Sequence, residues 1–197
     1  MSGVGFANLE LRDGQVRLSP TGAGDVDSLW QASLGADPWR YAPVQPRSRD
    51  QLAAVIARME DQRRAGLACA FTIRIPDGTV VGSTAYLARD AVHRRVEIGA
   101  TWLALPFRRS AVNTSCKLLL LDHAFGPMDC VRVEFKTDAR NQLSRAALAR
   151  LGAREEGTLR AHMVMPDGVL RDSVYFSILA SEWPDLRASL AARRSRH

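Results

Sequence analysis

Residues 96–125 read VEIGATWLALPFRRSAVNTSCKLLLLDHAF. Residues 96–105 are largely apolar on both faces, which is typical of a central strand covered on two sides. Pro106 ends this strand, and a turn with Arg108 and Arg109 leads into a leucine-rich helix that is predicted to begin at Asn113, a good N-cap residue. A strand, a basic turn and a helix N-terminus together suit a phosphate group. The alternative is a turn whose arginines face only water.

The rest of the chain alternates between strand and helix patterns. Strands are predicted at 15–19, 69–75, 79–87, 130–137, 160–165 and 169–179, and helices at 25–34, 48–66 and 138–152, with a short basic helix at the end. Two Pro-Asp-Gly turns join neighbouring strands. This order predicts one domain over residues 1–197, of the α/β (α+β) class, with a mixed central sheet of about seven strands flanked by helices.

Composition excludes several classes of protein. The net charge is +6, from 27 basic and 21 acidic residues. This excess attracts anions, yet the aromatic residues occupy apolar strand patterns, so a nucleic-acid partner is not expected. The three cysteines lie in apolar segments and should be reduced thiols, and no Cys/His spacing predicts a metal site. Neither a signal peptide nor a membrane-spanning run is recognisable, which predicts a cytoplasmic protein without membrane contact.

The chain resembles the GNAT acetyltransferases, specifically their RimJ/RimL-like branch. The residues that carry the resemblance lie mainly between Glu97 and Leu151. It implies the GNAT fold, acetyl-CoA as co-substrate, and direct transfer of the acetyl group to a primary amine in a ternary complex. The implied acceptor is a protein N-terminal α-amine or a small amine, and a homodimer is possible. The alternative is a GNAT-fold protein that binds or senses an acyl-CoA without catalysis.

The resemblance also implies a set of cofactor contacts. The GNAT phosphate cradle, Arg/Gln-x-x-Gly-x-Gly/Ala, stands here as residues 108–113, with Ala111 and Asn113 in the glycine positions. Gly99 is either the mark of a bulge that opens the strand for pantetheine or a close-packing glycine. The implied cofactor-binding residues are Leu103 and Leu105 through their backbones, Arg108, Arg109, Ser110, Ala111, Val112, Asn113, Thr114, Lys117 and Asn141.

Two residues are the catalytic candidates. Ser144 follows Asn141 in the Asn-x-x-Ser pattern, where its hydroxyl would face the departing thiolate; alternatively, both residues serve only to cap the helix. Glu97 resembles the Glu of the Glu-Ile-Gly segment of this branch and would be the general base, unless it pairs with Arg94 or Arg95.

The acceptor side of the site is less strongly marked. The strand region around Met163 lacks a Glu at the position used as base in RimL-type enzymes, which leaves His162 as a second candidate base or a structural histidine. The aromatic loop with Trp39 and Tyr41 would contact the acceptor amine.

Overall fold

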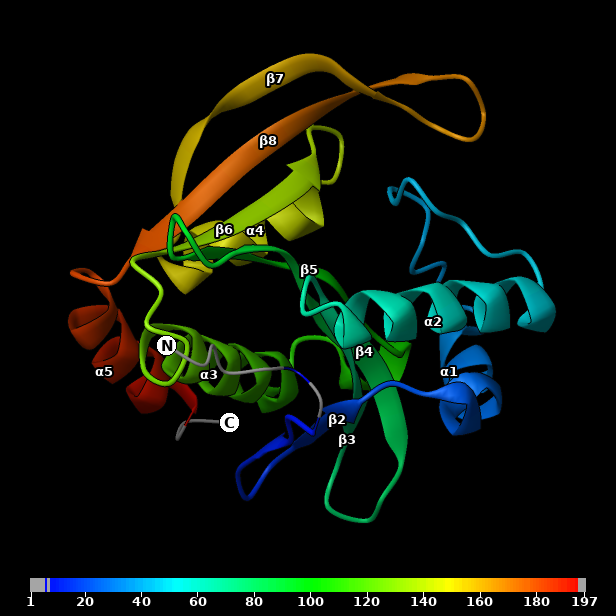
Figure 1. Cartoon of the computed structure of the whole chain (residues 1–197), viewed down its shortest axis with the longest axis horizontal. Helices are drawn as coiled ribbons and strands as arrows, with labels where there is room; N and C mark the ends of the chain where they lie inside the picture. The colour runs from blue at the N-terminus through cyan, green and yellow to red at the C-terminus, as the bar shows by residue number, and fades with distance from the viewer. Residues whose placement is uncertain (1–5, 7, 195–197) are drawn as a thin grey trace.

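An eight-stranded mixed sheet forms the centre of the computed structural model, which describes residue 6 and residues 8–194 (Figure 1). The strand order is β1-β2-β3-β4-β5-β6-β8-β7. Only β5 and β6 run parallel; the other neighbours are antiparallel. The strands are β1 Leu11–Arg12, β2 Arg17–Pro20, β3 Cys69–Arg74, β4 Val80–Asp90, β5 Arg95–Leu103, β6 Arg132–Asp138, β7 Arg154–Val164 and β8 Leu170–Leu179.

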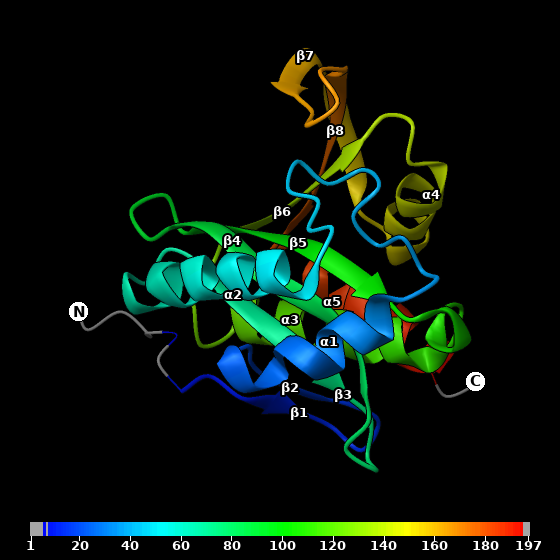
Figure 2. The same ribbon diagram turned by 90° about the vertical axis from the view of Figure 1, so that its right-hand side faces the viewer.

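Helices cover both faces of the sheet (Figure 2). On one face, α1 (Val26–Ser33) and α2 (Arg49–Arg64) pack through a small apolar cluster that includes Leu29 and Ile56. On the other face, α3 (Ala111–Phe125), α4 (Gln142–Leu151) and α5 (Trp183–Arg194) bury the larger core with the central strands. Within the described ranges, none of these helices has the length and apolar character needed to cross a membrane.

Local signals in the sequence position several of these elements. Ser48 caps α2 by accepting a hydrogen bond from the Gln51 N–H at 3.2 Å. In the two Pro-Asp-Gly turns, Asp77 and Asp167 accept hydrogen bonds from the backbone N–H two residues later. The glycines of both turns have positive φ, 89° and 80°. These predicted turns are confirmed.

The structure corrects the predicted number of strands and three predicted boundaries. The sheet has eight strands, because the short β1 was not predicted, and β7 begins at Arg154 rather than at residue 160. Strand β5 ends at Leu103, and Leu105–Phe107 forms a 3-10 turn (η2) that tolerates Pro106 near its start. Helix α3 begins at Ala111 with Ser110 as its N-cap, so the predicted start at Asn113 is wrong by one turn. Both residues are good caps, and the earlier one is used.

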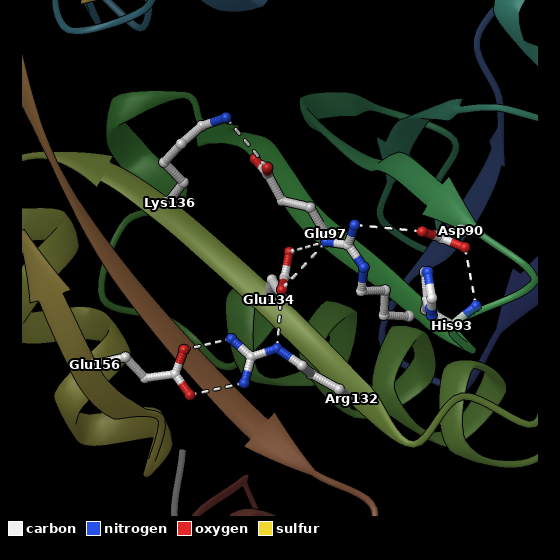
Figure 3. A network of polar contacts seen from close by, with 8 residues as sticks. Asp90, His93, Glu97, Arg132, Glu134, Lys136 and Glu156 are labelled. Atoms are coloured by element: carbon white, nitrogen blue, oxygen red, sulfur yellow. Dashed lines mark hydrogen bonds and ion pairs between the residues drawn. The ribbon is translucent and has the colours of Figure 1, made fainter. Parts of the chain in front are cut away.

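An ion-pair network joins β5, β6 and β7 at the paired end of the parallel strands (Figure 3). Arg132 binds Glu134 at 2.8 Å and also Glu156, while Arg95 reaches Asp90 and Glu134 at 3.3 Å. The hydrogen bonds from Arg132, with a further one from Ser177, lower the pKa of Glu156 to about 2 despite partial burial. The network fixes the strands on one side of the point where β5 and β6 separate.

Candidate active site

The site is built around a split between β5 and β6. Their pairing joins Arg95–Glu97 to residues 132–134 and ends there within the described chain. Beyond it, β5 bulges against β4: Ala85 pairs with Gly99 and Ser83 with Trp102, so two residues of β5 lie opposite Thr84. Ala100, one of the two, has φ 47°, a strained value for a residue with a side chain. The predicted bulge is present beside Gly99, and it turns β5 away from β6.

Gly99 is also closely packed, so its two predicted roles coexist. A Cβ at this position would lie 2.9 Å from Leu87 Cδ1 and 3.0 Å from Glu97 Oε1. Both distances are shorter than ordinary van der Waals contact. Because Gly99 has no side chain, the Glu97 carboxylate has space beside the split.

Lys117 of α3 reaches the bulge from the core side of the sheet. Its ammonium is buried, donates to Thr101 Oγ1 at 2.9 Å, and lies 5.8 Å from the ring centroid of Phe135 on β6. Thr101 Oγ1 in turn lies 2.8 Å from Thr84 Oγ1 on β4. Burial lowers the pKa of Lys117 to about 8. The Lys117 ammonium thus lies between β5 and β6, where the two strands separate.

The N-terminus of α3 lies at the end of the strand that forms the split. Ser110 Oγ accepts from the Val112 N–H at 3.3 Å and donates to the Phe107 carbonyl at 2.7 Å. The first-turn N–H groups, which include those of Ala111, Asn113 and Thr114, lack helical acceptors by geometry. They form the anion-favouring end of the helix. The seven residues predicted to contact the phosphates, 108–114, therefore lie together between η2 and the first turn of α3.

The two arginines of this turn differ. Arg108 donates from Nε to the Leu103 carbonyl at 3.1 Å and from Nη2 to the Ala36 carbonyl at 2.7 Å, so it ties the α1–α2 loop to the end of β5. These bonds give Arg108 a structural role that the sequence did not indicate. Both arginines are exposed, and Arg109 has φ 62°. Unlike Arg108, the Arg109 side chain makes no hydrogen bond or ion pair within the described chain.

Leu103 and Leu105 occupy different kinds of backbone. Leu103 pairs with Gly82 of β4, and its carbonyl accepts the Arg108 hydrogen bond. Leu105 is outside the strand, in the 3-10 turn, where its carbonyl accepts from the Arg108 N–H at 3.2 Å. Only Leu103 therefore holds the strand position from which a pantetheine contact was predicted. The predicted strand wrongly included Leu105, because Pro106 was taken as the residue that ends the strand.

Helix α4 starts at the end of β6 that borders the split. Asn141 is its N-cap, and its side-chain oxygen accepts from the Ser144 N–H at 3.1 Å. The capping role of Asn141 is thereby confirmed. The Ser144 hydroxyl makes no hydrogen bond within the described residues and is half-buried. Its backbone serves the cap, and its hydroxyl is left for another partner.

Glu97 lies on the opposite face of β5 from the core. The carboxylate is buried and pairs with Lys136 of β6, Oε2 to Nζ at 3.3 Å (Figure 3). The alternative pairing with Arg94 or Arg95 is wrong, since Arg94 binds Asp129 and Arg95 binds Asp90 and Glu134. A carboxylate beside the split, held by one lysine, is a group that can accept a proton through a water molecule.

The α1–α2 loop covers the same face of the split. Trp39 stacks on Trp30 of α1 and meets the edge of Trp102 on β5, with ring centroids 6.1 and 6.0 Å apart. Tyr41 lies 5.9 Å from the Arg140 guanidinium, and its carbonyl accepts from Arg171 Nη1 at 3.0 Å. The loop therefore reaches from β5 to β8, and Figures 1 and 2 both show it on the side of α2 that faces the β7–β8 hairpin.

His162 stands on β7 with structural contacts. Its Nδ1 lies 3.0 Å from the Ser173 hydroxyl, and its ring meets Tyr175 edge-on at 5.9 Å. Both partners belong to β8, the neighbouring strand. These contacts fit the structural interpretation of this histidine better than the role of base.

Four charged residues of the site were missed by sequence reasoning. Lys136 and Asp138 alternate onto the same face of β6, which the strand pattern could have shown. Asp138 is held by Arg140 through two hydrogen bonds of 2.9 and 2.6 Å; although burial acts against it, these bonds lower the pKa of Asp138. Arg171 comes from β8, and its position depends on long-range pairing that has no local sequence signal.

The arrangement combines an open strand edge, an anion-favouring helix start, a hydroxyl at a second helix start and a carboxylate. These are the groups required for acyl transfer between a thioester and an amine. Backbone N–H groups of the split strand can pair with an extended chain laid between β5 and β6. The carboxylate and the aromatic loop lie on one face of the sheet, and the buried ammonium lies on the other.

Comparison with known proteins agrees with this geometry. Residues 15–154 match the family model of the acetyltransferase (GNAT) domain. YdaF of Bacillus subtilis (strain 168), provisionally named a ribosomal N-acetyltransferase, is 34% identical over 107 residues, which span 54% of this chain and 57% of that relative.

Solved structures share the fold over almost the whole chain. A GCN5-related N-acetyltransferase from Brucella melitensis is 27% identical with a TM-score of 0.85, over 94% of this chain and 85% of that one. RimJ of Mycobacterium smegmatis, solved in complex with CoA-disulfide, is 26% identical with a TM-score of 0.78, over 95% and 94%. The chain therefore belongs to the GNAT acetyltransferase family, and its similarity to YdaF and RimJ is consistent with the RimJ/RimL-like branch.

Proposed function

We propose that this enzyme transfers the acetyl group of acetyl-CoA to the α-amine of a protein or peptide N-terminus, directly and within a ternary complex. The observation that carries the proposal is the split between β5 and β6, which has Glu97 on one face and the start of α4 at its border. The match to RimJ, which was solved with a CoA adduct, supports the choice of co-substrate.

The residues around the split suit a coenzyme A thioester. The first turn of α3 and the exposed Arg109 would hold the phosphates. The opened edge of β5 near Leu103 would pair with the pantetheine amides, and one of its N–H groups would polarise the thioester carbonyl. Lys117 adds a buried positive charge beside the bulge, where negative charge develops. Acetyl-CoA supplies the activated acetyl group.

The proton transfers fall to two residues of the chain. Glu97 would accept the proton of the attacking amine, through a water molecule, as the amine nitrogen bonds to the acetyl carbon. The Ser144 hydroxyl would hydrogen-bond to the sulfur as the carbon–sulfur bond breaks, and the proton returns to the thiolate. Each group lies beside the split, so neither transfer requires a rearrangement of the sheet.

The choice of an α-amine follows from the weakness of this base. Glu97 is paired with Lys136 and would reach the amine only through a water molecule, so it would act as a modest base. A lysine side chain, with a pKa of about 10.4, is almost wholly charged at pH 7, whereas an α-amine with a pKa near 8 is roughly one tenth neutral. An enzyme with a modest base therefore uses the α-amine far more easily.

A panel of acceptors with thiol release as readout tests the proposed function. Peptides with free N-termini, polyamines and aminoglycosides are each incubated with acetyl-CoA, and mass spectrometry locates the acetyl group. We expect thiol release with peptides and acetylation at the α-nitrogen, with no reaction of the same peptides when the N-terminus is blocked. Binding of acetyl-CoA without thiol release from any amine would favour the non-catalytic alternative.

A further inference from the structure

Arg171 of β8 is a buried guanidinium with too few partners. The residue is 4% exposed, and its Nη1 donates to the Tyr41 carbonyl at 3.0 Å. Its Nε is buried and makes no hydrogen bond within the described chain. Arginine is almost never fully buried unless it is paired, because an unmatched buried donor is costly. A backbone carbonyl is a neutral acceptor and only a weak match for a full positive charge.

Neighbouring carboxylates are already committed to other cations. Asp138 is held by Arg140 through its side chain and backbone N–H, and Glu97 is paired with Lys136. Among the described residues, no carboxylate lies within ion-pair distance of Arg171. Burial lowers the pKa of Arg171, while the charges of Asp138, Glu97 and Tyr175 oppose this effect from nearby. Lys136 and Arg140 therefore each have a carboxylate partner, whereas Arg171 has none within the described chain.

The Arg171 guanidinium lies where the acceptor would enter. Arg171 is bonded to the loop that carries Trp39 and Tyr41, and Glu97 is among the charged groups close to it. An incoming carboxylate could replace the Tyr41 carbonyl at Nη1 and give a charge-assisted hydrogen bond in its place. A bound carboxylate would also give Arg171 the ion pair that it lacks within the described chain.

We infer that Arg171 recognises a carboxylate on the acceptor, so that the preferred substrate is a peptide with an acidic residue at its first position. This inference rests on the proposed function. It concerns only the carboxylate that accompanies the reacting amine, and it gives Arg171 the role of a specificity residue.

Paired peptides that differ only in charge test the inference. The kcat/KM for peptides beginning with Asp or Glu is compared with that for the same peptides beginning with Asn or Gln. We expect the acidic member of each pair to be better by at least about tenfold, in line with a charge-assisted hydrogen bond. Free glutamate and glutamine, tested beside the peptides, show whether an α-carboxylate is used instead of the side chain.

Variants locate the preference at Arg171. In Arg171→Gln the ratio of acidic to neutral peptide should fall to near one, while Arg171→Lys should keep part of it. Arg160→Gln, which removes an exposed arginine from β7, is the matched control and should retain the wild-type ratio. Thermal unfolding of each variant shows whether it is folded.

Two results would overturn the inference. One is equal use of acidic and neutral peptides by the wild-type enzyme, which leaves the proposed function intact. The other is an acidic preference that survives in folded Arg171→Gln. A failure to acetylate any peptide, acidic or neutral, would instead count against the proposed function itself.

Discussion

Lys117 holds a positive charge in the protein interior at a cost in stability. Its pKa in the folded chain is lowered to about 8 by burial, from 10.5 in a model compound. The unfolded chain therefore binds this proton more tightly, and folding is penalised at every pH below 8. The penalty is relieved as the pH rises from 8 to 10.5, where the folded form loses the proton first. Such a cost beside the bulge suggests that the charge is kept for function.

Replacing Lys117 by Met should stabilise the fold at pH 7 by up to about 3 kcal/mol, at 1.36 kcal/mol per pKa unit. The gain over wild type should shrink between pH 8 and 10.5. Denaturant unfolding at pH 7 and pH 10.5 measures both quantities. Lys117→Arg is the control, because its guanidinium stays charged and should show no recovery at high pH. A stability difference that is the same at both pH values would contradict the buried-charge explanation.

Arg108 and Arg109 should have separable effects on stability and binding. Arg108→Ala removes two hydrogen bonds to backbone carbonyls and should lower the free energy of unfolding by about 1–3 kcal/mol. Arg109→Ala should leave stability unchanged and weaken acetyl-CoA binding by about tenfold or more, since it removes the proposed phosphate contact. Calorimetric titration and thermal unfolding of both variants check this. Wild-type affinity in Arg109→Ala would place the phosphates elsewhere.

Ser144 and Asn141 both lie at the start of α4, but replacing them should have different effects. Ser144→Ala should lower kcat with little change in the KM for acetyl-CoA, as for a contact made mainly in the transition state. Asn141→Ala removes the N-cap and should cost about 1 kcal/mol of stability. Steady-state kinetics and chemical unfolding of the two variants distinguish these effects. An unchanged kcat in Ser144→Ala would leave that residue with a structural role only.

The bulge of β5 depends on the small residue before it. In Gly99→Ala the new methyl group would press on Leu87 and on the Glu97 carboxylate, both of which can move. We expect a lower kcat, because Glu97 is displaced from Lys136, with the fold retained. Ala100→Gly is the matched control: it relieves the positive φ at the adjacent position and should not lower stability. Equal kcat in wild type and Gly99→Ala would count against a catalytic role for Glu97.

Elements with local signals could be predicted from the sequence, and those fixed by distant contacts could not. Ser48, the two Pro-Asp-Gly turns and Asn141 act through neighbours in the chain, so their roles were visible. At the start of α3, Ser110 and Asn113 are both good caps, and only the packing of the preceding turn selects Ser110. The sequence marked the bulge at Gly99, but the residue with strained backbone is Ala100. Because alanine does not favour positive φ, nothing in the sequence indicated strain at this position.

The same distinction divides the candidate site. The order of strands and helices along the chain predicts that the split, the α3 turn and the start of α4 lie together, because parallel strands end on one edge of a sheet. Glu97 pairs with Lys136 of β6 and Arg171 with the Tyr41 carbonyl of the α1–α2 loop, and both partners are far away in the sequence without a local mark. The partner of Glu97 was therefore predicted wrongly, and that of Arg171 was not predicted.

In the proposed function, the molecule combines Glu97 as a base of modest strength with a binding edge for an extended cofactor arm and with the positive charge of Arg171 near the acceptor. The modest base and the positive charge both favour an acceptor amine that is already partly neutral at pH 7. Because Glu97 acts through water in this account, Glu97→Gln should reduce kcat/KM by less than a hundredfold, and activity should depend more on the acceptor's own pKa than on the enzyme. Rates measured for wild type and Glu97→Gln on one peptide test this; a larger loss would make Glu97 the principal base.

The most direct test is kcat/KM as a function of pH for two peptides of identical sequence. One has a free α-amine and no lysine side chain available for reaction, and the other has a blocked N-terminus and one free lysine. We predict that the α-amine peptide is the better substrate at pH 7 and that its rate rises through the pKa of its own amine. A higher kcat/KM for the blocked lysine peptide at pH 7 would contradict the proposed function.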